Sequence, residues 1–360
     1  MALLPALVNA HTHLELSYLA GAVRPAARFP DWIRAVMAAR RAHPDPGAPT
    51  IVSAARAAIE SARASGTGLV GDVSNTLVTV PLLAGTGVAA RVFYELLGFN
   101  AADPEGRVRA AREAIDTGTP AGGDVRLSLA PHAPYSVSPG LLAALRGDLD
   151  AHPGDVSTVH VSESADEVEF VARGSGAWRD LLTEVGAWSQ AWEPPGTSPV
   201  AYLADVGFLD GRVIAVHAVQ CDGDDLARLR ALGTTIVSCP RSNRHVGVGD
   251  PPIEAFYAAG VDVAFGTDSL ASAADLNLFA ELAVARGLAP RVPARLLLES
   301  ATMGGARALG FGGELGSIEP GKRAAIIAVR VPPGVGDVEE YLLSGIAPSA
   351  VAWLDARTHA

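Results

Sequence analysis

Short apolar runs alternate with longer helix-forming segments along most of this chain, and this alternation constrains the fold more than any other feature. Strands that alternate with helices form parallel sheets, and eight such units can close into a barrel. The sequence therefore predicts an α/β fold, a (β/α)8 barrel of the TIM type. The eight runs are Leu3–Asn9, Leu69–Asp72, Ala90–Leu96, Val125–Ala130, Val156–Val161, Arg212–His217, Thr235–Ser238 and Asp262–Gly266. Apolar residues at helical spacing lie between them in Pro30–Arg41, Thr50–Ala64, Pro104–Ile115, Asp222–Leu232 and Leu276–Arg286.

The length and a change in composition near residue 308 predict one large domain with a small appendage. The chain has 360 residues, 49% of them hydrophobic, which is enough for one barrel with a large core. We expect residues 1–308 to form the barrel and residues 309–360 to form a small, incomplete C-terminal β appendage around the apolar strand Ala324–Val331. The irregular stretch Trp188–Pro199 precedes the last barrel strand, so we expect it to form a loop over the barrel mouth.

Charge and cysteine content exclude several classes of partner. A formal net charge of -11 argues against a nucleic-acid or anionic-membrane surface, which would need a basic face. Two cysteines, Cys221 and Cys239, are too few for a disulfide framework. We find no signal peptide and no uncharged run long enough to span a membrane. We expect a cytoplasmic protein with a small-molecule partner, and its oligomeric state stays open, a homodimer included.

Histidines and one aspartate lie where several of the apolar runs end. His11 and His13 follow the first run on alternate residues, so both side chains face the same side of a strand. His160 lies near the end of the fifth run, His217 ends the sixth, and Asp268 follows the eighth. Active sites of such barrels lie at the carboxyl ends of the strands. One divalent ion could be held there by the first three histidines and the aspartate, with water completing its shell.

This ordered set resembles the amidohydrolase superfamily, and the resemblance covers residues 3–331. It implies a hydrolase of carbon–nitrogen bonds other than peptide bonds, with a metal that acidifies a water molecule. Glu163, three residues after His160, resembles the acid that protonates a ring nitrogen in the ring deaminases of this superfamily. His217 resembles the imidazole that hydrogen-bonds the attacking water, and Asp268 resembles the metal ligand that takes its proton.

The composition favours one metal over two. Superfamily members with two metals often bridge them with a carbamylated lysine after the fourth strand, yet the only lysine of this chain is Lys322. Glu95, after the third strand, is the alternative bridge and keeps a second metal open. Zinc is our first expectation for the metal, and ferrous iron accepts the same donors.

Loops around His132 and Arg241 are similar to those of deaminases that act on adenosine-like nucleosides. Within this branch, Glu15 and the helix that carries Trp32 are similar to the group of 6-aminodeoxyfutalosine deaminases of menaquinone biosynthesis. We expect Glu15 to accept hydrogen bonds from ribose hydroxyls and Arg241 to pair with the benzoate of that substrate. Arg241 could equally cap a helix or pair with a surface acid, and Trp32 could pack its helix onto the barrel.

Other functions stay open at this point. The same site could deaminate methylthioadenosine, S-adenosylhomocysteine, guanine or cytosine, or remove a halide from a triazine. A barrel that has lost catalysis and serves as a binding scaffold is the remaining alternative. Superfamily members usually carry a longer N-terminal segment that pairs with the C-terminal strands, but only ten residues precede His11. We therefore expect either a natively longer N-terminus or an unpaired edge on the strand Ala324–Val331.

Overall fold

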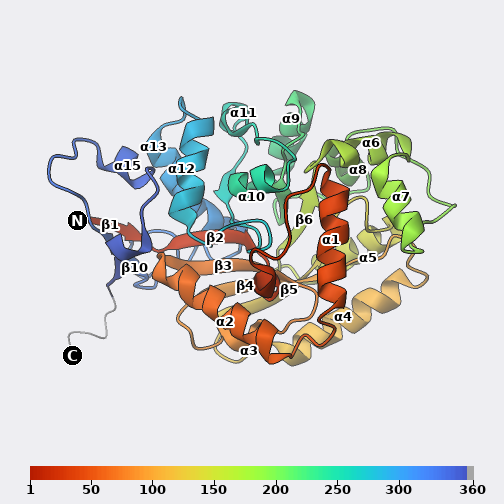
Figure 1. The fold of residues 1–360 in the computed structure, drawn as a ribbon, viewed down its shortest axis with the longest axis horizontal. Helices are drawn as coiled ribbons and strands as arrows, with labels where there is room; N and C mark the ends of the chain where they lie inside the picture. Colours follow the sequence, from red (N-terminus) through yellow and green to blue (C-terminus); the bar gives the residue numbers. More distant parts are fainter. Residues whose placement is uncertain (355–360) are drawn as a thin grey trace.

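The computed structural model describes residues 1–354 as a parallel eight-stranded barrel with a small antiparallel sheet at one end (Figure 1). The predicted α/β barrel is confirmed. Strands β2 to β5 pair as one group of neighbours and β6 to β9 as a second. The barrel strands are β2 (Leu7–Thr12), β3 (Thr67–Ser74), β4 (Ala89–Leu96), β5 (Val125–Pro131), β6 (Ser157–Val161), β7 (Val213–His217), β8 (Thr235–Ser238) and β9 (Val263–Phe265). The small sheet contains β1 (Ala2–Pro5), β10 (Ile326–Val329) and β11 (Val351–Trp353).

Hydrogen bonds close the barrel where the two groups of strands meet. On one side, the Ser157 hydroxyl on β6 donates to the Leu129 carbonyl on β5 at 2.9 Å. On the other side, the backbone N–H of Thr267, just after β9, donates to the His11 carbonyl on β2 at 3.1 Å. The loop after β9 is therefore tied to the first barrel strand.

Close packing fixes the strand that carries the first histidine. A Cβ atom at Gly71 on β3 would lie 2.4 Å from the carbonyl oxygen of Ala10, and one at Gly266 would lie 2.7 Å from that of His11. Both neighbours of β2 therefore approach its backbone at positions where only glycine fits. These contacts hold His11 at the edge of the barrel mouth.

The helices connect the strands, and the predicted helical segments all form with ends shifted by a few residues. Ser138, Ser164 and Ser198 cap three of them by accepting a backbone N–H. The helices are α1 (Phe29–Arg41), α2 (Pro49–Ala64), α3 (Val80–Leu83), α4 (Pro104–Gly118), α5 (Pro139–Ala151), α6 (Ala165–Arg173), α7 (Ala177–Glu184), α8 (Pro199–Asp205), α9 (Gly223–Leu232), α10 (Pro240–His245), α11 (Ile253–Ala259), α12 (Leu278–Leu288), α13 (Ala294–Glu299), α14 (Gly305–Ala308) and α15 (Val338–Leu342). Short helical turns are η1 (Leu14–Leu19), η2 (Ser300–Gly304) and η3 (Pro348–Ala350). Among the described residues, every helix is too short or too polar to span a bilayer.

The first apolar run of the sequence was expected to be one strand, and this expectation is wrong. The structure divides the run at Ala6 into β1 and β2, which belong to different sheets. β1 pairs antiparallel with β10, and β10 pairs on its other side with β11. The strand expected at Ala324–Val331 therefore has partners on both sides, and the expected unpaired edge is wrong. β1 also pairs across the domain boundary predicted between residues 308 and 309.

The stretch Trp188–Pro199 packs away from the centre of the barrel mouth. Trp192 stacks on Phe170 of α6 with ring centroids 4.8 Å apart, and Trp188 stacks on Phe99 at 5.8 Å. The stretch contributes no residue to the cavity described below. Helix α1 stands there instead, beside the carboxyl ends of β2 and β3 and at the opposite end of the barrel from the small sheet (Figure 1).

Candidate metal centre and active site

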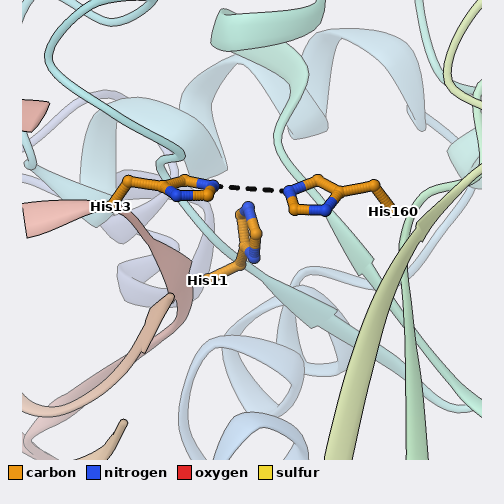
Figure 2. A group of neighbouring side chains, drawn as sticks. All are labelled: His11, His13 and His160. Carbon is orange, nitrogen blue, oxygen red and sulfur yellow. Dashed lines mark hydrogen bonds between the residues drawn. The ribbon is translucent and has the colours of Figure 1, made fainter. Parts of the chain in front are cut away.

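Three histidines converge at the carboxyl end of the barrel strands, as Figure 2 shows. His11 lies on β2, His13 follows that strand directly, and His160 lies on β6. Nε2 of His13 and Nε2 of His160 are 3.3 Å apart. The ring of His11 stands nearly edge-on to both, with centroid distances of 5.0 and 4.9 Å. One ring nitrogen from each residue thus faces a common point, and these atoms lie within 4.8 Å of one another.

The state of these nitrogens fits a bound cation. Nε2 of His11 is buried and has no hydrogen-bond partner. Burial, followed by the neighbouring His160 and His13, lowers the pKa of His11 well below its usual value, so the ring stays neutral. Nδ1 of His160 donates to the His132 carbonyl at 2.9 Å, which leaves the lone pair of its Nε2 free for a metal. A buried nitrogen without a partner is costly, and one divalent metal ion shared by the three rings would remove that cost.

Asp268 brings a carboxylate to the same point. Its Oδ1 lies 3.8 Å from Nε2 of His11 and 3.7 Å from Nε2 of His13. Burial alone would raise the pKa of Asp268, but the adjacent His13 and His217 and a hydrogen bond from Ser242 lower it below its usual value. The side chain is therefore ionised at neutral pH and fits the fourth position of a metal site.

Hydroxyl groups hold this carboxylate in place. Oδ2 of Asp268 accepts hydrogen bonds from the hydroxyls of Ser242 and Ser272 at 2.5 and 3.2 Å. Its Oδ1 accepts the backbone N–H of Ser269 at 2.8 Å. Because the serine hydroxyls occupy Oδ2, Oδ1 is the oxygen left to face the histidines.

Glu163 and His217 form the opposite side of the site. Oε1 of Glu163 lies 3.6 Å from Nε2 of His217. Burial, then the charges of Asp268 and Glu167, raise the pKa of Glu163 well above its usual value, which favours the protonated form. Burial lowers the pKa of His217 to about 4, so that ring is neutral. Nδ1 of His217 accepts a hydrogen bond from the Asn243 amide at 3.0 Å, which leaves the ring hydrogen on Nε2, facing Glu163.

Left-handed backbone geometry turns these side chains into the site. Ser162, His217 and Asp268 all follow or end barrel strands and have φ angles of +51°, +74° and +56°. Such angles are rare outside glycine and concentrate at functional sites. The carboxylate of Glu167 braces the first of these turns by accepting the backbone N–H groups of Ser162 and Glu163, both at 2.9 Å.

A cavity of about 200 Å³ opens beside the histidines. We call its two sides the inner end and the outer end. The inner end is lined by the strand-end residues His13, His132, His160, Glu163, His217 and Asp268. The outer end is lined mainly by one face of α1 and by a few neighbours: Leu16, Phe29, Trp32, Ile33, Val36, Met37, Arg40, Asn75, Leu97 and Tyr135. The α1 residues recur every third or fourth position, which is the spacing of one helix face.

Comparison with known proteins agrees with this geometry. A family model described as "Amidohydrolase family" matches residues 2–352. The chain belongs to the amidohydrolase family. Its predicted enzyme class, a hydrolase of carbon–nitrogen bonds, is confirmed. Members of this family generally bind a divalent metal, in agreement with the histidine cluster, while the identity of the metal stays a prediction.

Several named relatives cover much of this amidohydrolase. The aminodeoxyfutalosine deaminase of Deinococcus radiodurans is 34% identical over 317 residues, which are 85% of this chain and 73% of the relative. The 5-methylthioadenosine/S-adenosylhomocysteine deaminase of Syntrophobacter fumaroxidans is 35% identical over 212 residues, or 57% of this chain and 44% of the relative.

Two solved structures are similar in fold and sequence. An adenosine deaminase from Xanthomonas campestris with bound zinc has a TM-score of 0.82 and 29% identity, covering 97% of this chain and 78% of that one. Helicobacter pylori aminofutalosine deaminase in complex with methylthio-coformycin has a TM-score of 0.80 and 26% identity, covering 95% and 82%.

Two of the residues predicted to bind substrate line the cavity of this amidohydrolase. His132 lies at the inner end, with its Nδ1 hydrogen-bonded to the Ser136 hydroxyl at 2.6 Å. Trp32 lies at the outer end, and its buried indole N–H has no partner among the described residues. This N–H is therefore an unsatisfied donor at a residue that lines the cavity.

Arg241 does not line the cavity, and its predicted contact with the substrate benzoate stays a prediction. Its guanidinium binds Asp275 at 2.8 Å and lies 3.6 Å from the buried Glu281. Its backbone N–H also donates to Glu281 at 3.1 Å. These contacts agree with the alternative that Arg241 pairs with an acid.

Glu15 is already surrounded by donors from the protein. Its carboxylate accepts the hydroxyls of Ser74 and Thr76 at 2.7 Å each and the backbone N–H groups of Asn75 and Thr76 at 3.1 Å. Arg40 adds a further bond at 3.2 Å. A ribose would have to share these oxygens, so the predicted contact of Glu15 with ribose stays a prediction. The structure assigns Glu15 a role in ordering the loop after β3.

Glu95 lies close to the cluster but does not complete a second set of free donors. Its Oε1 is 3.5 Å from Nδ1 of His160, and its Oε2 accepts the Asn75 amide at 2.9 Å. Ligand atoms of Glu95, His132 and His160 also lie within 4.8 Å of one another. However, Nδ1 of His160 carries a hydrogen that it donates to the His132 carbonyl, so it has no lone pair for a metal. This favours one metal, and the number of metals stays a prediction.

The polar side chains that support the site were not predicted from the sequence. Ser242 and Asn243 directly follow Arg241, yet we assigned a role only to the arginine. Consecutive residues of α10 point in different directions, and nothing in the sequence alone indicates which of the three faces the metal centre. Glu167 was missed because an acid in the first turn of a helix is usually a solvated residue.

Proposed function

We propose that this amidohydrolase is a metal-dependent deaminase of an adenine-type nucleoside, and that its substrate is 6-aminodeoxyfutalosine, which it converts to futalosine and ammonia. The observation that carries the proposal is the buried Glu163, which lines the same small cavity as His13, His160 and Asp268 and has its Oε1 3.6 Å from Nε2 of His217. A ring deaminase must protonate the ring nitrogen next to the carbon that is attacked, and a buried carboxylic acid at this place can supply that proton.

The metal would be held by His11, His13, His160 and Asp268. A divalent cation bound there lowers the pKa of a water molecule so that the water can attack near neutral pH. Zinc suits three imidazoles and a carboxylate, and ferrous iron accepts the same donors.

The remaining steps use side chains of this chain. Oδ1 of Asp268 is ionised and can accept the proton that the attacking water releases. Glu163 can donate its own proton to the ring nitrogen next to the amino-bearing carbon. The Nε2 hydrogen of His217 can bond to the incoming oxygen. A carbon–oxygen bond then forms, and the amino group takes the proton held by Asp268 and leaves as ammonia when the carbon–nitrogen bond breaks. The ring nitrogen keeps the proton from Glu163, and the hydroxyl proton of the intermediate returns to Glu163.

The relatives support a nucleoside as substrate. Aminodeoxyfutalosine deaminase matches over most of this chain, and the similar structures include an adenosine deaminase and an aminofutalosine deaminase. The outer end of the cavity is mostly apolar, so it can also accept the methylthio group of methylthioadenosine. Deamination of methylthioadenosine is therefore the second candidate, and relatives of that name match over more than half of the chain.

A substrate panel tests the proposal. Protein loaded with zinc or with ferrous iron is given 6-aminodeoxyfutalosine, methylthioadenosine, adenosine, guanine and cytosine, and ammonia release is measured. We expect the highest kcat/KM for 6-aminodeoxyfutalosine. A preference for methylthioadenosine would overturn the named substrate but keep the nucleoside deaminase. A preference for a free base would overturn the nucleoside, and metal-loaded protein without any turnover would leave the binding-scaffold alternative.

A further inference from the structure

Arg40, in the last turn of α1, occupies a distinctive position in the outer end of the cavity. Within residues 1–354, it is the one arginine or lysine that lines this cavity. A series of contacts connects it to the metal centre: Arg40 bonds to Asn75, Asn75 bonds to Glu95, and Glu95 lies beside His160. Arg40 therefore lies beyond the first layer of residues around the metal centre.

The guanidinium of Arg40 makes two hydrogen bonds with the protein and keeps further N–H donors for a ligand. Its Nη1 donates to the Asn75 amide oxygen at 2.9 Å, and its Nη2 donates to Glu15 at 3.2 Å. An arginine has five N–H donors, so three remain after these two bonds. The side chain is 35% exposed, which leaves it accessible to a ligand.

Glu15 does not cancel the charge of Arg40 completely. Besides Arg40, the Glu15 carboxylate accepts hydrogen bonds from Ser74, Asn75 and Thr76, as described above. Its negative charge is spread over these donors, and its position is fixed by them. Glu15 thus acts as a positioning residue that orients Arg40 toward the cavity.

A second cavity of about 330 Å³ lies on the other side of Arg40. Arg40 and Leu16 line both cavities, so they form the wall between the two. The second cavity adds Arg41 and His43, and Tyr18 packs edge-on against His43 at 5.2 Å. The surroundings of Arg40 are therefore basic and aromatic on one side and apolar on the other.

We propose that Arg40 binds a carboxylate on an aromatic substituent that extends from the sugar of the substrate, with Glu15 holding the guanidinium in place. This inference rests on the proposed function, because it concerns the part of the nucleoside that does not react. A planar guanidinium matches a carboxylate through two parallel hydrogen bonds. A phosphate would bring more negative charge beside Glu15 and the apolar Met37, so the site suits a monoanion better.

The test compares two ligands that differ in the negative charge of the carboxylate, which the ester lacks. Binding of 6-aminodeoxyfutalosine and of its benzoate methyl ester is measured by calorimetry, alongside kcat/KM for both. In the wild-type protein we expect the acid to bind about 10- to 100-fold more tightly than the ester, the range of a charge-assisted pair. In Arg40→Gln the preference should fall to about one, because the acid weakens while the ester does not.

Three further variants keep the test decisive. Arg40→Lys retains the positive charge but lacks the planar guanidinium. We expect it to keep part of the preference for the acid over the ester that Arg40→Gln loses. Arg34→Gln is the matched control, because Arg34 lies on the same helix, pairs with Asp31 and Glu184, and does not line the cavity. Arg241→Gln tests the rival arginine, and we expect no change in the preference. Glu15→Gln should reduce the preference less than Arg40→Gln does.

The outcomes separate the inference from the function on which it rests. Equal binding of acid and ester to the wild-type protein, or an equal loss for both ligands in Arg40→Gln, would overturn the role of Arg40. A loss of the preference in Arg241→Gln would transfer the role to that residue. If the acid is preferred and Arg40 is responsible, but no ammonia is released, then the proposed deamination fails and the binding inference stands.

Discussion

The inner and outer ends of the cavity are built in different ways. At the inner end, the side chains come from five barrel strands or the loops after them, most are buried, and His217 and Asp268 are braced by hydrogen bonds from Asn243 and Ser242. At the outer end, most side chains come from the single helix α1, and they are apolar except for Arg40 and the Trp32 indole. The barrel thus holds the groups that carry out chemistry, while one helix carries the groups that select the substrate.

This division predicts that inner-end changes affect turnover and outer-end changes affect substrate affinity. The largest effect is expected for His11→Ala. Removing one of the three imidazoles leaves an incomplete donor set, so we expect bound metal to fall to near zero and turnover to fall below detection. Elemental analysis of the purified variant measures the metal. A variant that keeps a full equivalent of metal would show that His11 is not a ligand.

We expect Glu163→Gln to lower turnover almost as much as His11→Ala does, but without loss of the bound metal. The glutamine keeps the shape of the side chain but has no acidic proton, and a positioned acid contributes roughly 10²- to 10⁴-fold. We therefore expect kcat to fall by about that factor while metal content stays as in the wild type. Comparable activity in both proteins would contradict the assignment of Glu163 as the proton donor.

The substitution Trp32→Phe tests whether a residue at the outer end of the cavity affects substrate affinity rather than turnover. This change keeps the aromatic packing but removes the buried N–H that has no partner. One neutral hydrogen bond is worth about 0.5–1.5 kcal/mol, so we expect KM to rise roughly 2- to 10-fold with kcat unchanged. Trp178→Phe is the matched control, because the Trp178 N–H is also buried without a partner but that side chain does not line the cavity. A fall in kcat for Trp32→Phe would break the division between the two ends.

Glu281 lines neither end of the cavity, so we expect Glu281→Gln to affect turnover least. Burial raises the pKa of Glu281 to about 8, with Arg241 acting in the opposite direction. Between the ordinary pKa near 4.5 and pH 8, the unfolded chain loses a proton that the native protein keeps. The free energy of unfolding therefore falls as pH rises through this window, by up to about 1.4 kcal/mol per pH unit.

In Glu281→Gln, the contribution of this carboxyl group to the pH dependence of the free energy of unfolding is absent. Glu167, whose pKa burial raises to about 7, continues to titrate below that pH, so the difference between the proteins should be clearest from pH 7 to 8. Urea unfolding at pH 5, 6, 7 and 8 measures it. Identical pH dependence in the two proteins would show that Glu281 is ionised in the native state.

The same division explains what could be predicted from the sequence. Strand order and the rule that barrel sites lie at the carboxyl ends of strands bring His11, His160 and Asp268 together before any coordinates are known. The lining of the outer end depends on where helix α1 packs against the barrel, and no local sequence pattern specifies the position of that helix. Arg241 was predicted to bind the benzoate, yet its guanidinium lies beside Asp275 and Glu281 and does not line the cavity. Such long-range contacts leave no signal in the local sequence.

Anomalous X-ray diffraction from crystals of the zinc-loaded protein tests the central claim most directly. We predict one strong peak per chain, about 2.0–2.2 Å from Nε2 of His11, His13 and His160 and from Oδ1 of Asp268. A peak bound by Glu95 and His132 instead, or no peak among these four residues, would contradict the metal centre on which the proposed deamination depends.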